Sequence, residues 1–375
     1  MADQRLKILF VTHDTGNYGA SRSLQLLLNH LEGVEADLVV QKPFLGALDH
    51  AELRRRFGRN VSHVLEAFLP FDTCYQYGRK GPLFTRSIRL YNRTLALPAK
   101  RRIDRLMVEG KYDLVHLNSL VLHSLISDAY PCVLHMRDIY DGSNPAAIEN
   151  VQKAAGVIFI DEATRAPFRD IPLRKSIVLN NPIDMGRVAD YTDYRPPLPD
   201  LDVTRHTVFS VIGVVSEKKG TGFVIETFLK HRDQDARLLI VGGREQAAIK
   251  RYRSLARADR RVIFWGEEPD IMKVYAISDY ILRGEEIPCV GRTVYEGLYA
   301  GCRVIVPGDK SAPPPMFEYD TYRDAIFFYR PRHAEDLLAL LRRQAGDKVR
   351  ERKLRSNVHA YVRSFHEFVS SLGSV

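Results

Sequence analysis

The chain has 375 residues, of which 45% are apolar, and this length suits two domains of about 150–200 residues better than a single core. Its four cysteines form no C-x-x-C pair, which argues against a disulfide framework or a zinc site and favours a reduced, cytoplasmic compartment. No basic segment followed by an apolar stretch opens the chain, and no run of about 18 apolar residues occurs, so we expect neither a secretory signal nor a membrane span.

The net charge of +9 is concentrated in one segment. Residues 52–111 contain fourteen Lys and Arg against five Asp and Glu, a surplus as large as that of the whole chain. Such a segment attracts anionic surfaces, whether phosphates, phospholipid headgroups or nucleic acid; a solvated helical face is the alternative. We predict that three neighbouring arginines, Arg101, Arg102 and Arg105, belong to an acceptor or membrane surface.

The first half of the chain alternates predicted strands and helices. An apolar run at 7–12 leads into a loop with Gly16 and Gly19 and then into leucines at helical spacing, which is typical of a doubly wound α/β domain. Residues 44–111 show no continuous hydrophobic periodicity and are expected to form an irregular, basic insertion. Further strands are predicted at 36–40, 114–117, 132–135, 157–160 and 176–179. This alternation favours a parallel sheet.

A second alternation follows a segment rich in proline and aspartate, residues 191–206, which we interpret as a linker. The predicted strands are 208–215, 237–241, 261–265, 280–282 and 303–306, and continuous helix is expected from residue 335 onward. The predicted domains are 1–190 and 207–355, with a C-terminal helix at 356–375. Because ligands of open parallel sheets bind at the carboxyl ends of the strands, we expect the site in the loops that follow them, at a cleft between the domains.

The strongest candidate site follows the predicted strand 280–282. Gly291 lets the backbone approach a ligand, and Arg292 and Thr293 begin a helix whose free N–H groups favour a diphosphate. Glu296 lies one turn after Arg292, where its carboxylate could accept hydrogen bonds from ribose hydroxyls. An ordinary helix with a surface Arg–Glu pair is the alternative.

Other loops that follow strands carry weaker signals. Lys218 and Lys219 offer compact cations for a phosphate oxygen or a departing diphosphate, although the sequence KKG also occurs in surface turns. Gly243 and Arg244 follow the next strand, and Gly266 ends the strand after that. Each of these motifs is a weak indication of a binding site when taken alone.

The first domain contributes a different set of residues. Gly16 and Gly19 precede a helix start, but their G-x-x-G spacing is not the G-x-G-x-x-G dinucleotide fingerprint and argues against a dehydrogenase. His135 ends a predicted strand and is expected to point toward the cleft; a structural histidine is the alternative. Arg137 and Asp138 follow it and could simply pair with each other.

Taken together, these motifs resemble those of the retaining glycosyltransferases of family 4, which have the GT-B fold of two Rossmann-like domains. The resemblance covers nearly the whole chain except about residues 44–110, and the segment GRTVYEGLYAG is its most specific part. The matching segments are YGASRSL, YDLVHLNS, VLHMRD, LNNPID, KKG, LLIVGG, FWG and GRTVYEGLYAG.

The resemblance implies roles for several residues. Lys219 would contact the donor diphosphate, Glu296 the ribose, and Gly291–Thr293 the phosphates through their backbone. His135 would lie near the transferred sugar, and the helix at 356–375 would cross back onto the first domain. Transfer would retain the anomeric configuration and would need no metal.

Two departures from the family pattern shape the prediction. The family usually has two glutamates separated by seven residues, but Pro288 stands eight positions before Glu296. We therefore predict Glu286 as the sugar-facing acid, with Glu285 as the alternative. In the family, an arginine usually precedes the diphosphate lysine by five residues. The corresponding position in this chain is not basic, and we expect Lys218 to supply the missing positive charge.

The sequence thus predicts a hexosyltransferase without a cofactor, using a UDP- or GDP-linked sugar and a glycan or lipid-linked acceptor. We expect a role in cell-envelope polysaccharide or lipopolysaccharide synthesis, at the inner face of an anionic membrane and without nucleic acid as a partner. A nucleotide-sugar epimerase or a phosphorylase of the same fold is one alternative. A non-enzymatic binder of anionic surfaces, built on a degenerate transferase scaffold, is the other.

Overall fold

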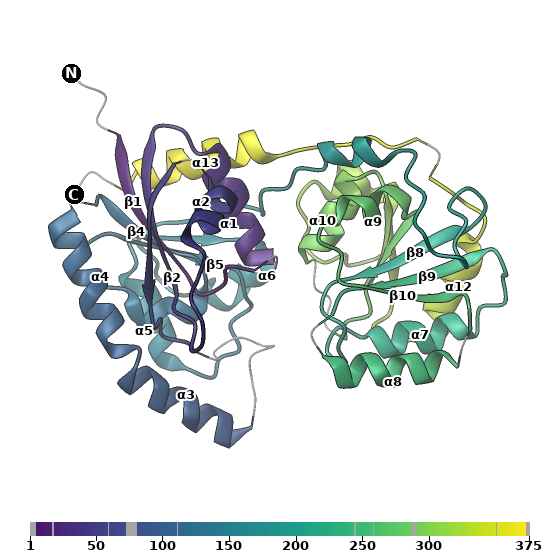
Figure 1. Cartoon of the computed structure of the whole chain (residues 1–375), viewed down its shortest axis with the longest axis horizontal. Coiled ribbons are helices and arrows are strands. Elements are labelled where there is room, and N and C mark those ends of the chain that lie inside the picture. Colours follow the sequence, from purple (N-terminus) through teal and green to yellow (C-terminus); the bar gives the residue numbers. More distant parts are fainter. Residues whose placement is uncertain are drawn as a thin grey trace. The chain divides into compact units, whose positions relative to one another are not determined.

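The computed structural model divides the chain into two compact units, each built on a parallel sheet (Figure 1). Unit 1 comprises Met1–Pro182 and Asn357–Val375, and unit 2 comprises Ile183–Ser356. The residues that the structure describes are 5–16, 19–58, 60–72, 81–110, 112–243, 245–257, 259–286, 291–349 and 351–372. This architecture confirms the predicted two-domain α/β class.

Unit 1 has a seven-stranded parallel sheet in the order β3-β2-β1-β4-β5-β6-β7. The strands are β1 (Leu6–Thr12), β2 (Val34–Gln41), β3 (Val61–Ala67), β4 (Leu114–Leu117), β5 (Cys132–Met136), β6 (Gly156–Phe159) and β7 (Ser176–Val178). The central strands are buried on both faces, which explains why they form continuous apolar runs in the sequence.

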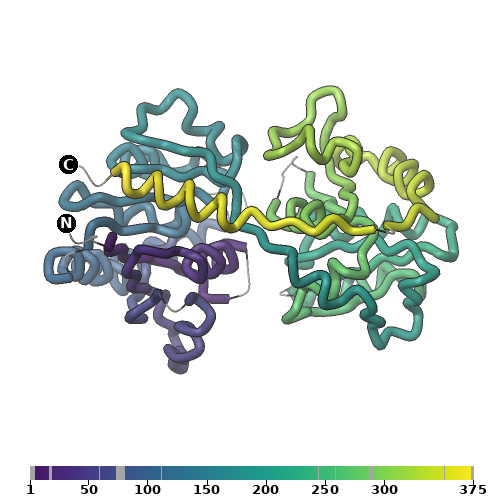
Figure 2. Tube along the Cα trace, turned by 90° about the horizontal axis from the view of Figure 1, so that it is seen from above, coloured from purple at the N-terminus to yellow at the C-terminus, as the bar shows by residue number. Residues whose placement is uncertain are grey.

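Helices cover both faces of this sheet. One face packs against α1 and α13, with Leu24, Leu27 and Phe365 in its core, and the other packs against α4, α5 and η1. Figure 2 shows α13 lying along unit 1 although the chain reaches it from unit 2. The helical segments are α1 (Gly19–His30), α2 (His50–Phe57), α3 (Pro82–Thr94), α4 (Leu97–Gly110), η1 (Leu120–Leu125), α5 (Pro145–Lys153), α6 (Glu162–Arg165), η2 (Ala166–Phe168) and α13 (Val358–Ser370).

The prediction of an irregular insertion at residues 44–111 was wrong. This segment contains α2, the edge strand β3, and the helices α3 and α4. An edge strand is packed on few sides, so β3 lacks the continuous apolar run of its neighbours. Helix α3 has no fully buried residue, although Phe84, Ile88 and Tyr91, at helical spacing, form a partly buried apolar stripe that could have revealed it.

Unit 2 has a six-stranded parallel sheet in the order β10-β9-β8-β11-β12-β13. The strands are β8 (Thr207–Ile212), β9 (Ala236–Val241), β10 (Val262–Gly266), β11 (Tyr280–Leu282), β12 (Arg303–Pro307) and β13 (Ile326–Tyr329). The edge strand β13 was not predicted, whereas the other five strands lie where the sequence pattern indicated.

The helices of unit 2 also cover both faces. Helices α7, α8 and α12 pack on one face, and α9 and α10 on the other. The segments are η3 (Gly186–Tyr191), α7 (Thr221–Leu229), α8 (Gln246–Ala256), α9 (Met272–Ile277), α10 (Arg292–Tyr299), α11 (Tyr319–Tyr322), η4 (Arg323–Ala325) and α12 (Ala334–Gln344). The segment predicted as a linker, residues 191–206, belongs to this unit, and its Leu201 lies in the core.

The expected continuous helix from residue 335 is interrupted. Helix α12 ends at Gln344, and Gly346 has a left-handed φ of 82°, which redirects the chain. The stretch from there to α13 is held instead by unit 2: the Val349 N–H, for example, donates to the Asp279 carboxylate at 2.8 Å. Within the described part of the chain, no helix has both the length and the apolar character needed to cross a bilayer.

Candidate active site

In unit 2, the loops that leave the carboxyl ends of neighbouring strands touch one another. Gly220 has φ of 66°, and a side chain there would overlap the carbonyl oxygen of Gly284, in the loop after β11. Gly242 has φ of 138°, and a side chain there would overlap the carbonyl oxygen of Gly213. Only glycine permits these approaches, so the predicted glycine loops after β8, β9 and β11 form one surface.

A buried carboxylate lies where these loops meet. Glu285 is 1% exposed, and its Oε1 is 3.3 Å from the Nζ of Lys219. Arg283, 7% exposed, donates from Nε to Oε2 of Glu285 at 2.9 Å and also contacts Oε1 through Nη2. Burial raises the pKa of Glu285, but the two cations outweigh it and hold the pKa below its ordinary value. Glu285 is therefore an ionised group between two cations.

Arg283 also fastens this loop to the start of α10. Its Nη1 donates to Oγ1 of Thr293, and a Cβ on Gly291 would lie 2.8 Å from the same nitrogen. A side chain at position 291 would therefore displace the guanidinium from the helix start. Arg283 was not among the predicted site residues, although a charged residue directly after a fully buried strand is a signal that could have revealed it.

Glu296 is completely buried on α10. Its Oε1 accepts from Nε of Arg292 at 2.7 Å, and its Oε2 accepts from the hydroxyl of Tyr275 on α9 at 2.6 Å. The Arg–Glu pair exists, but it is a buried pair and not the surface pair that was the alternative. Glu296 is thus held by side chains of α9 and α10, and its contact with a ribose stays a prediction.

Glu286 lies outside this network, although it was predicted as the sugar-facing acid. Its side chain is exposed, whereas the alternative, Glu285, occupies the buried position beside Lys219. Successive side chains of an extended segment point to opposite sides, so only one of two neighbours can face the cations. Arg244 and Pro288 lie outside the described residues.

The remaining predicted donor-side residues share the same edge of the sheet. Lys218 is exposed beside the half-buried Lys219. Gly243 lies against the side chain of Glu267, since a Cβ there would overlap its carboxylate. Gly266, with φ of 90°, ends β10 and has open space where a side chain would be. Their roles in binding a donor stay predictions.

In unit 1, His135 is completely buried, which differs from the expected orientation toward a cleft. Its Nδ1 is 3.2 Å from Nε2 of His116 and 3.3 Å from Nη2 of Arg137, and the His116 ring packs against Phe365 of α13. Burial, together with Arg137 and His116, holds the pKa of His135 well below its ordinary value, so the ring is neutral. The helix layer over β5 explains this burial.

Polar side chains gather at the carboxyl edge of this sheet, and most of them were not among the predicted site residues. Arg137 donates from Nε to Asn118 and from Nη1 to Asn181, both at 2.8 Å. The hydroxyl of Ser119 donates to Asp138 at 3.2 Å. Asn118 and Ser119 directly follow the buried strand β4, and Arg137 and Asp138 directly follow the buried strand β5. A polar side chain immediately after a buried strand is their common signal, whereas Asn181, three residues beyond the partly exposed β7, lacks it.

The loop after β1 adds its own groups. His13 is largely buried, and burial lowers its pKa despite the opposing influence of Asp138 and Asp14. Its Nδ1 has no hydrogen-bond partner among the described residues. The Gly16 N–H donates to Asp14 at 2.8 Å, and Gly19 begins α1. The described residues contain no group of three or more His, Cys, Asp or Glu side chains able to hold a metal ion.

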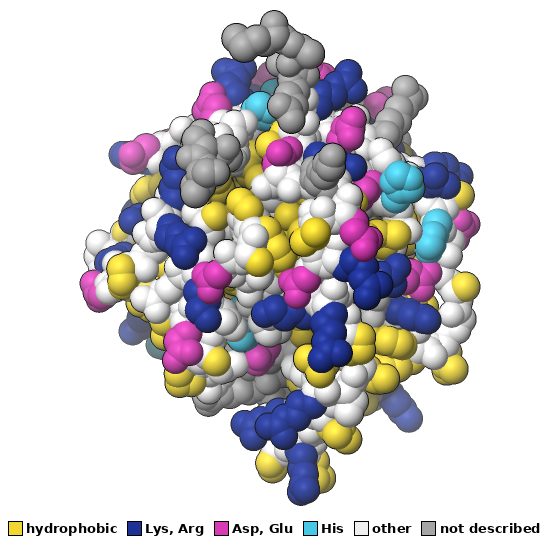
Figure 3. Space-filling model, turned by 90° about the vertical axis from the view of Figure 1, so that its left-hand side faces the viewer, with side chains coloured by type: hydrophobic (Ala, Val, Ile, Leu, Met, Phe, Trp, Pro, Cys, Tyr) yellow, Lys and Arg dark blue, Asp and Glu magenta, His cyan; other side chains and the backbone are white. Residues whose placement is uncertain are grey.

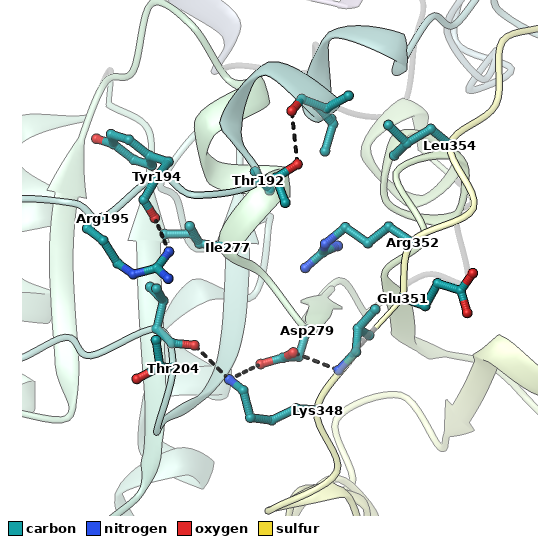
Figure 4. A pocket seen from close by; sticks show the side chains of 15 residues that line it. Thr192, Tyr194, Arg195, Thr204, Ile277, Asp279, Lys348, Glu351, Arg352 and Leu354 are labelled. Carbon is teal, nitrogen blue, oxygen red and sulfur yellow. Dashed lines mark hydrogen bonds and ion pairs between the residues drawn. The ribbon is translucent and has the colours of Figure 1, made fainter.

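A cavity of about 460 Å³ lies in unit 2 at the opposite edge of the sheet (Figure 4). It is lined by Asp279, which precedes β11, and by residues around Lys348. Lys348 belongs to the stretch between α12 and α13, which we call the return segment. The Lys348 ammonium donates to the carbonyl of Val203 at 3.0 Å and lies 3.4 Å from Asp279. Because these groups bind the return segment to the sheet, we assign the cavity a structural role.

The three arginines of the predicted acceptor or membrane surface, Arg101, Arg102 and Arg105, are exposed on α4. The inner side of this helix is buried through Ile103 and Met107. Arg102 also donates to the carbonyl of Glu66 at 2.6 Å. The arginines therefore lie on the outer face of a packed helix, and their role stays a prediction.

Comparison with known proteins agrees with this architecture. Residues 206–344 match the family model described as Glycosyl transferases group 1. HepE of Anabaena in complex with UDP and glucose is 18% identical, with a TM-score of 0.72 over 98% of this chain and 100% of that chain. A glycosyltransferase from Rickettsia africae ESF-5 is 17% identical, with a TM-score of 0.68 over 99% of each chain.

Sucrose-phosphate synthase of Thermosynechococcus elongatus is 13% identical, with a TM-score of 0.67 over 98% of each chain. No curated protein matches the sequence. Identities this low establish the fold, which is that of the GT-B glycosyltransferases and confirms the predicted fold class. The matched family segment spans most of the candidate site in unit 2, which supports a glycosyltransferase.

Proposed function

We propose that the protein is a retaining, metal-independent glycosyltransferase that moves a sugar from a nucleotide-sugar donor onto a glycan or lipid-linked acceptor. The observation that carries this proposal is the Lys219–Glu285–Arg283 cluster, joined to the start of α10 within the segment that matches the family model. A uridine nucleotide is the favoured donor, because structures of the same fold contain UDP with glucose and UDP-glucose.

The cluster suits a diphosphate leaving group. Lys219 and the N–H groups at the start of α10 would bind the phosphates, and Glu285 would orient Lys219 and accept hydrogen bonds from the sugar. A well-placed donor of this kind can contribute about 3–4 kcal/mol in the transition state. Glu296, oriented by Tyr275 and Arg292, would accept hydrogen bonds from the ribose.

Transfer breaks the bond between the anomeric carbon and the diphosphate oxygen and forms one to the acceptor oxygen. The acceptor proton would move to the departing phosphate, which the cations stabilise. Retention of configuration and independence from metal rest on the resemblance to family 4. His135 would act as a positioning residue through Arg137, since its neutral ring is buried and does not reach the surface.

We also propose a place for the protein in cell-envelope polysaccharide or lipopolysaccharide synthesis, in the cytoplasm and beside the inner face of the membrane. The basic segment 52–111 supports contact with an anionic surface. The same segment would suit a non-enzymatic binder on a degenerate scaffold, but that alternative does not need the ion pair between Lys219 and the buried Glu285.

Nucleotide binding tests the proposal directly. Thermal unfolding is measured in excess chelator with UDP, GDP, dTDP or ADP, and a ligand at 100 times its Kd should add about 2.7 kcal/mol of stability. We expect UDP to stabilise the protein and Lys219→Met to abolish that effect. Stabilisation by no nucleotide would contradict the proposal, and loss of the UDP effect in chelator alone would contradict its metal independence.

The stereochemistry needs a separate assay. Incubation with UDP-glucose and candidate acceptors, followed by NMR of the product, should show the donor's anomeric configuration in the new linkage. An inverted product would contradict the retaining mechanism. Release of an isomerised nucleotide-sugar without an acceptor would indicate an epimerase instead.

A further inference from the structure

The exposed apolar side chains of this protein are concentrated in one region. In the described part of the chain, the large apolar side chains that project into solvent all belong to residues 44–108, which overlap the basic segment 52–111. They are Phe44, Leu45, Leu83, Leu90, Leu95, Leu97 and Val108. Scattered apolar residues on a surface need no explanation, but a cluster within a basic region indicates an interaction surface.

Helix α3 combines exposed apolar side chains with basic ones most clearly. It is 13 residues long and has no buried residue, and Leu83 and Leu90, two turns apart, are 84% and 64% exposed. The exposed arginines Arg86, Arg89 and Arg93 lie along the same outward side, and no acidic residue occurs in the helix. At the lower end of the face in Figure 3, basic and hydrophobic side chains gather over α3.

The loop after β2 extends this surface. Phe44 and Leu45 are 70% and 91% exposed, and the Phe44 ring lies 5.8 Å from the ring of Tyr91 on α3. Lys42 lies over the ring of Phe68, which in turn contacts Phe44 at 5.6 Å. The loop and the helix therefore form one continuous apolar and basic face.

This face is fastened to the carboxyl edge of the unit 1 sheet. The Tyr91 hydroxyl donates to the carbonyl of Leu69 at 2.8 Å, and the Asn92 side chain exchanges two hydrogen bonds with the backbone of Phe71 at 2.9 and 2.7 Å. Both partners follow the end of β3, and the Phe71 ring contacts His13 after β1. Ligands of open parallel sheets bind at this edge.

We propose that α3 and the loop of Phe44 and Leu45 form a membrane-binding face. The α3 face, as we call Phe44, Leu45, Leu83, Arg86, Arg89, Leu90 and Arg93, lies in the plane of an anionic bilayer. Its apolar side chains enter the boundary between headgroups and acyl chains, and its arginines bind lipid phosphates. The proposal deepens the proposed function, because a lipid-linked acceptor would then reach the sheet edge from the bilayer.

Charge favours a membrane over a second copy of the chain. A two-fold contact through the α3 face would set Arg86, Arg89 and Arg93 against the same three arginines, and α3 has no acid to compensate them. An anionic bilayer supplies both the opposite charge and an apolar layer. The occupant that this face fits is therefore a lipid surface with negatively charged headgroups.

Vesicle flotation tests the proposal without any donor, so it can fail independently of catalysis. Vesicles of phosphatidylcholine are compared with vesicles that also contain phosphatidylglycerol. Replacing Arg86, Arg89 and Arg93 with Gln should weaken binding to the anionic vesicles roughly 100-fold at low salt. Replacing Leu83 and Leu90 with Ser should remove the part of the binding that resists high salt, because salt screens charges but does not weaken apolar insertion.

A charge-matched control separates location from net charge. Lys230, Arg232 and Lys250 are exposed in unit 2, and replacing them with Gln removes the same three charges. This control should bind anionic vesicles within about twofold of the wild type, since the α3 face is intact. All variants should keep the unfolding midpoint and the UDP affinity of the wild type, because α3 has no buried residue.

Three results would overturn the proposal. The first is wild-type affinity in both α3 variants, and the second is an equal loss in the unit 2 control, which would show that only net charge matters. The third is a wild-type protein that does not bind anionic vesicles. If it is instead a dimer that Leu83→Ser with Leu90→Ser converts to a monomer, the α3 face is an interface between copies.

Discussion

Glu285 and Glu286 are adjacent in the chain but have different surroundings. Glu285 is buried between Arg283 and Lys219, whereas Glu286 is exposed. Removing one member of a buried ion pair leaves the other charge without compensation, which costs about 3–5 kcal/mol. The two positions therefore offer a matched pair of substitutions that differ in burial and not in chemistry.

Glu285→Gln should lower the free energy of unfolding by about 3 kcal/mol, because Arg283 would lose its counterion, and should reduce sugar transfer. Glu286→Gln should change stability by less than about 0.5 kcal/mol. Urea unfolding and a transfer assay measure both effects. Normal transfer by Glu285→Gln together with loss in Glu286→Gln would instead identify Glu286 as the sugar-facing acid.

The stability difference between wild type and Glu285→Gln should depend on pH. The folded-state pKa of Glu285 is held below the ordinary value of 4.5, so its charge contributes stability above that value and loses it as the pH falls through the folded pKa. Urea unfolding from pH 7 down to about pH 3 should show the difference shrinking below about pH 4.5. A difference that stays constant over this range would contradict the ion-pair assignment.

Glu296 should respond differently, because the ribose contact proposed for it would be made in substrate and product alike. Glu296→Gln should weaken UDP binding by about 1.5–3 kcal/mol, as expected for a charged hydrogen bond. Tyr275→Phe keeps the carboxylate and removes only one of its donors, so it should weaken UDP binding less. Calorimetric titration measures both, and unchanged affinity in Glu296→Gln would exclude the ribose role.

At the scale of elements, the candidate site depends on loops that touch through glycine. Gly220 combines a left-handed φ with a side-chain position already occupied by the Gly284 carbonyl, whereas Gly266 has a similar φ but open space. A substitution at Gly220 would therefore incur both backbone strain and a clash between the loops, whereas a substitution at Gly266 would incur backbone strain alone. Comparing them isolates the contribution of the contact between the loops after β8 and β11.

Gly220→Ala should destabilise the protein by about 3 kcal/mol or more, since backbone strain adds to a steric overlap that neither loop can relieve easily. Gly266→Ala should cost about 1–2 kcal/mol, the cost of the left-handed backbone alone. Thermal unfolding compares the two. Equal costs would mean that the loops do not touch at Gly220.

At the scale of the whole molecule, the chain enters unit 2 at Ile183 and leaves it along the return segment before α13. Asp279 holds this segment at the sheet: its carboxylate accepts from the N–H groups of Val208 at 2.9 Å and Val349 at 2.8 Å, and it is 3% exposed. A buried carboxylate with several donors is the kind of group whose loss is costly.

Asp279→Asn should destabilise unit 2 by about 1.5–3 kcal/mol, because an amide nitrogen would face backbone donors. Glu351→Gln, at an exposed position in the same segment, should change stability by less than about 0.5 kcal/mol. Calorimetric unfolding in the presence of UDP would show whether the affected transition is the one that the nucleotide stabilises. Equal effects of the two changes would contradict the assigned role of Asp279.

The sequence by itself determined the order of the central strands and the position of the glycine loops, because these depend on local periodicity and on backbone freedom at single residues. It also indicated Lys219, Gly291 and Glu296 as neighbours of one sheet edge. Edge strands such as β3 escaped prediction, because they lack the continuous apolar run of central strands.

Only the tertiary structure decided which side chains meet. Contacts between segments distant in the sequence bring Glu285 to Lys219 and Arg283 to Thr293. They also bury His135 beneath helices. Local patterns place a residue after a strand, but they do not say which neighbour it will face. Those choices follow from how the loops and helices pack against each sheet, where burial makes an unpaired charge too costly to tolerate.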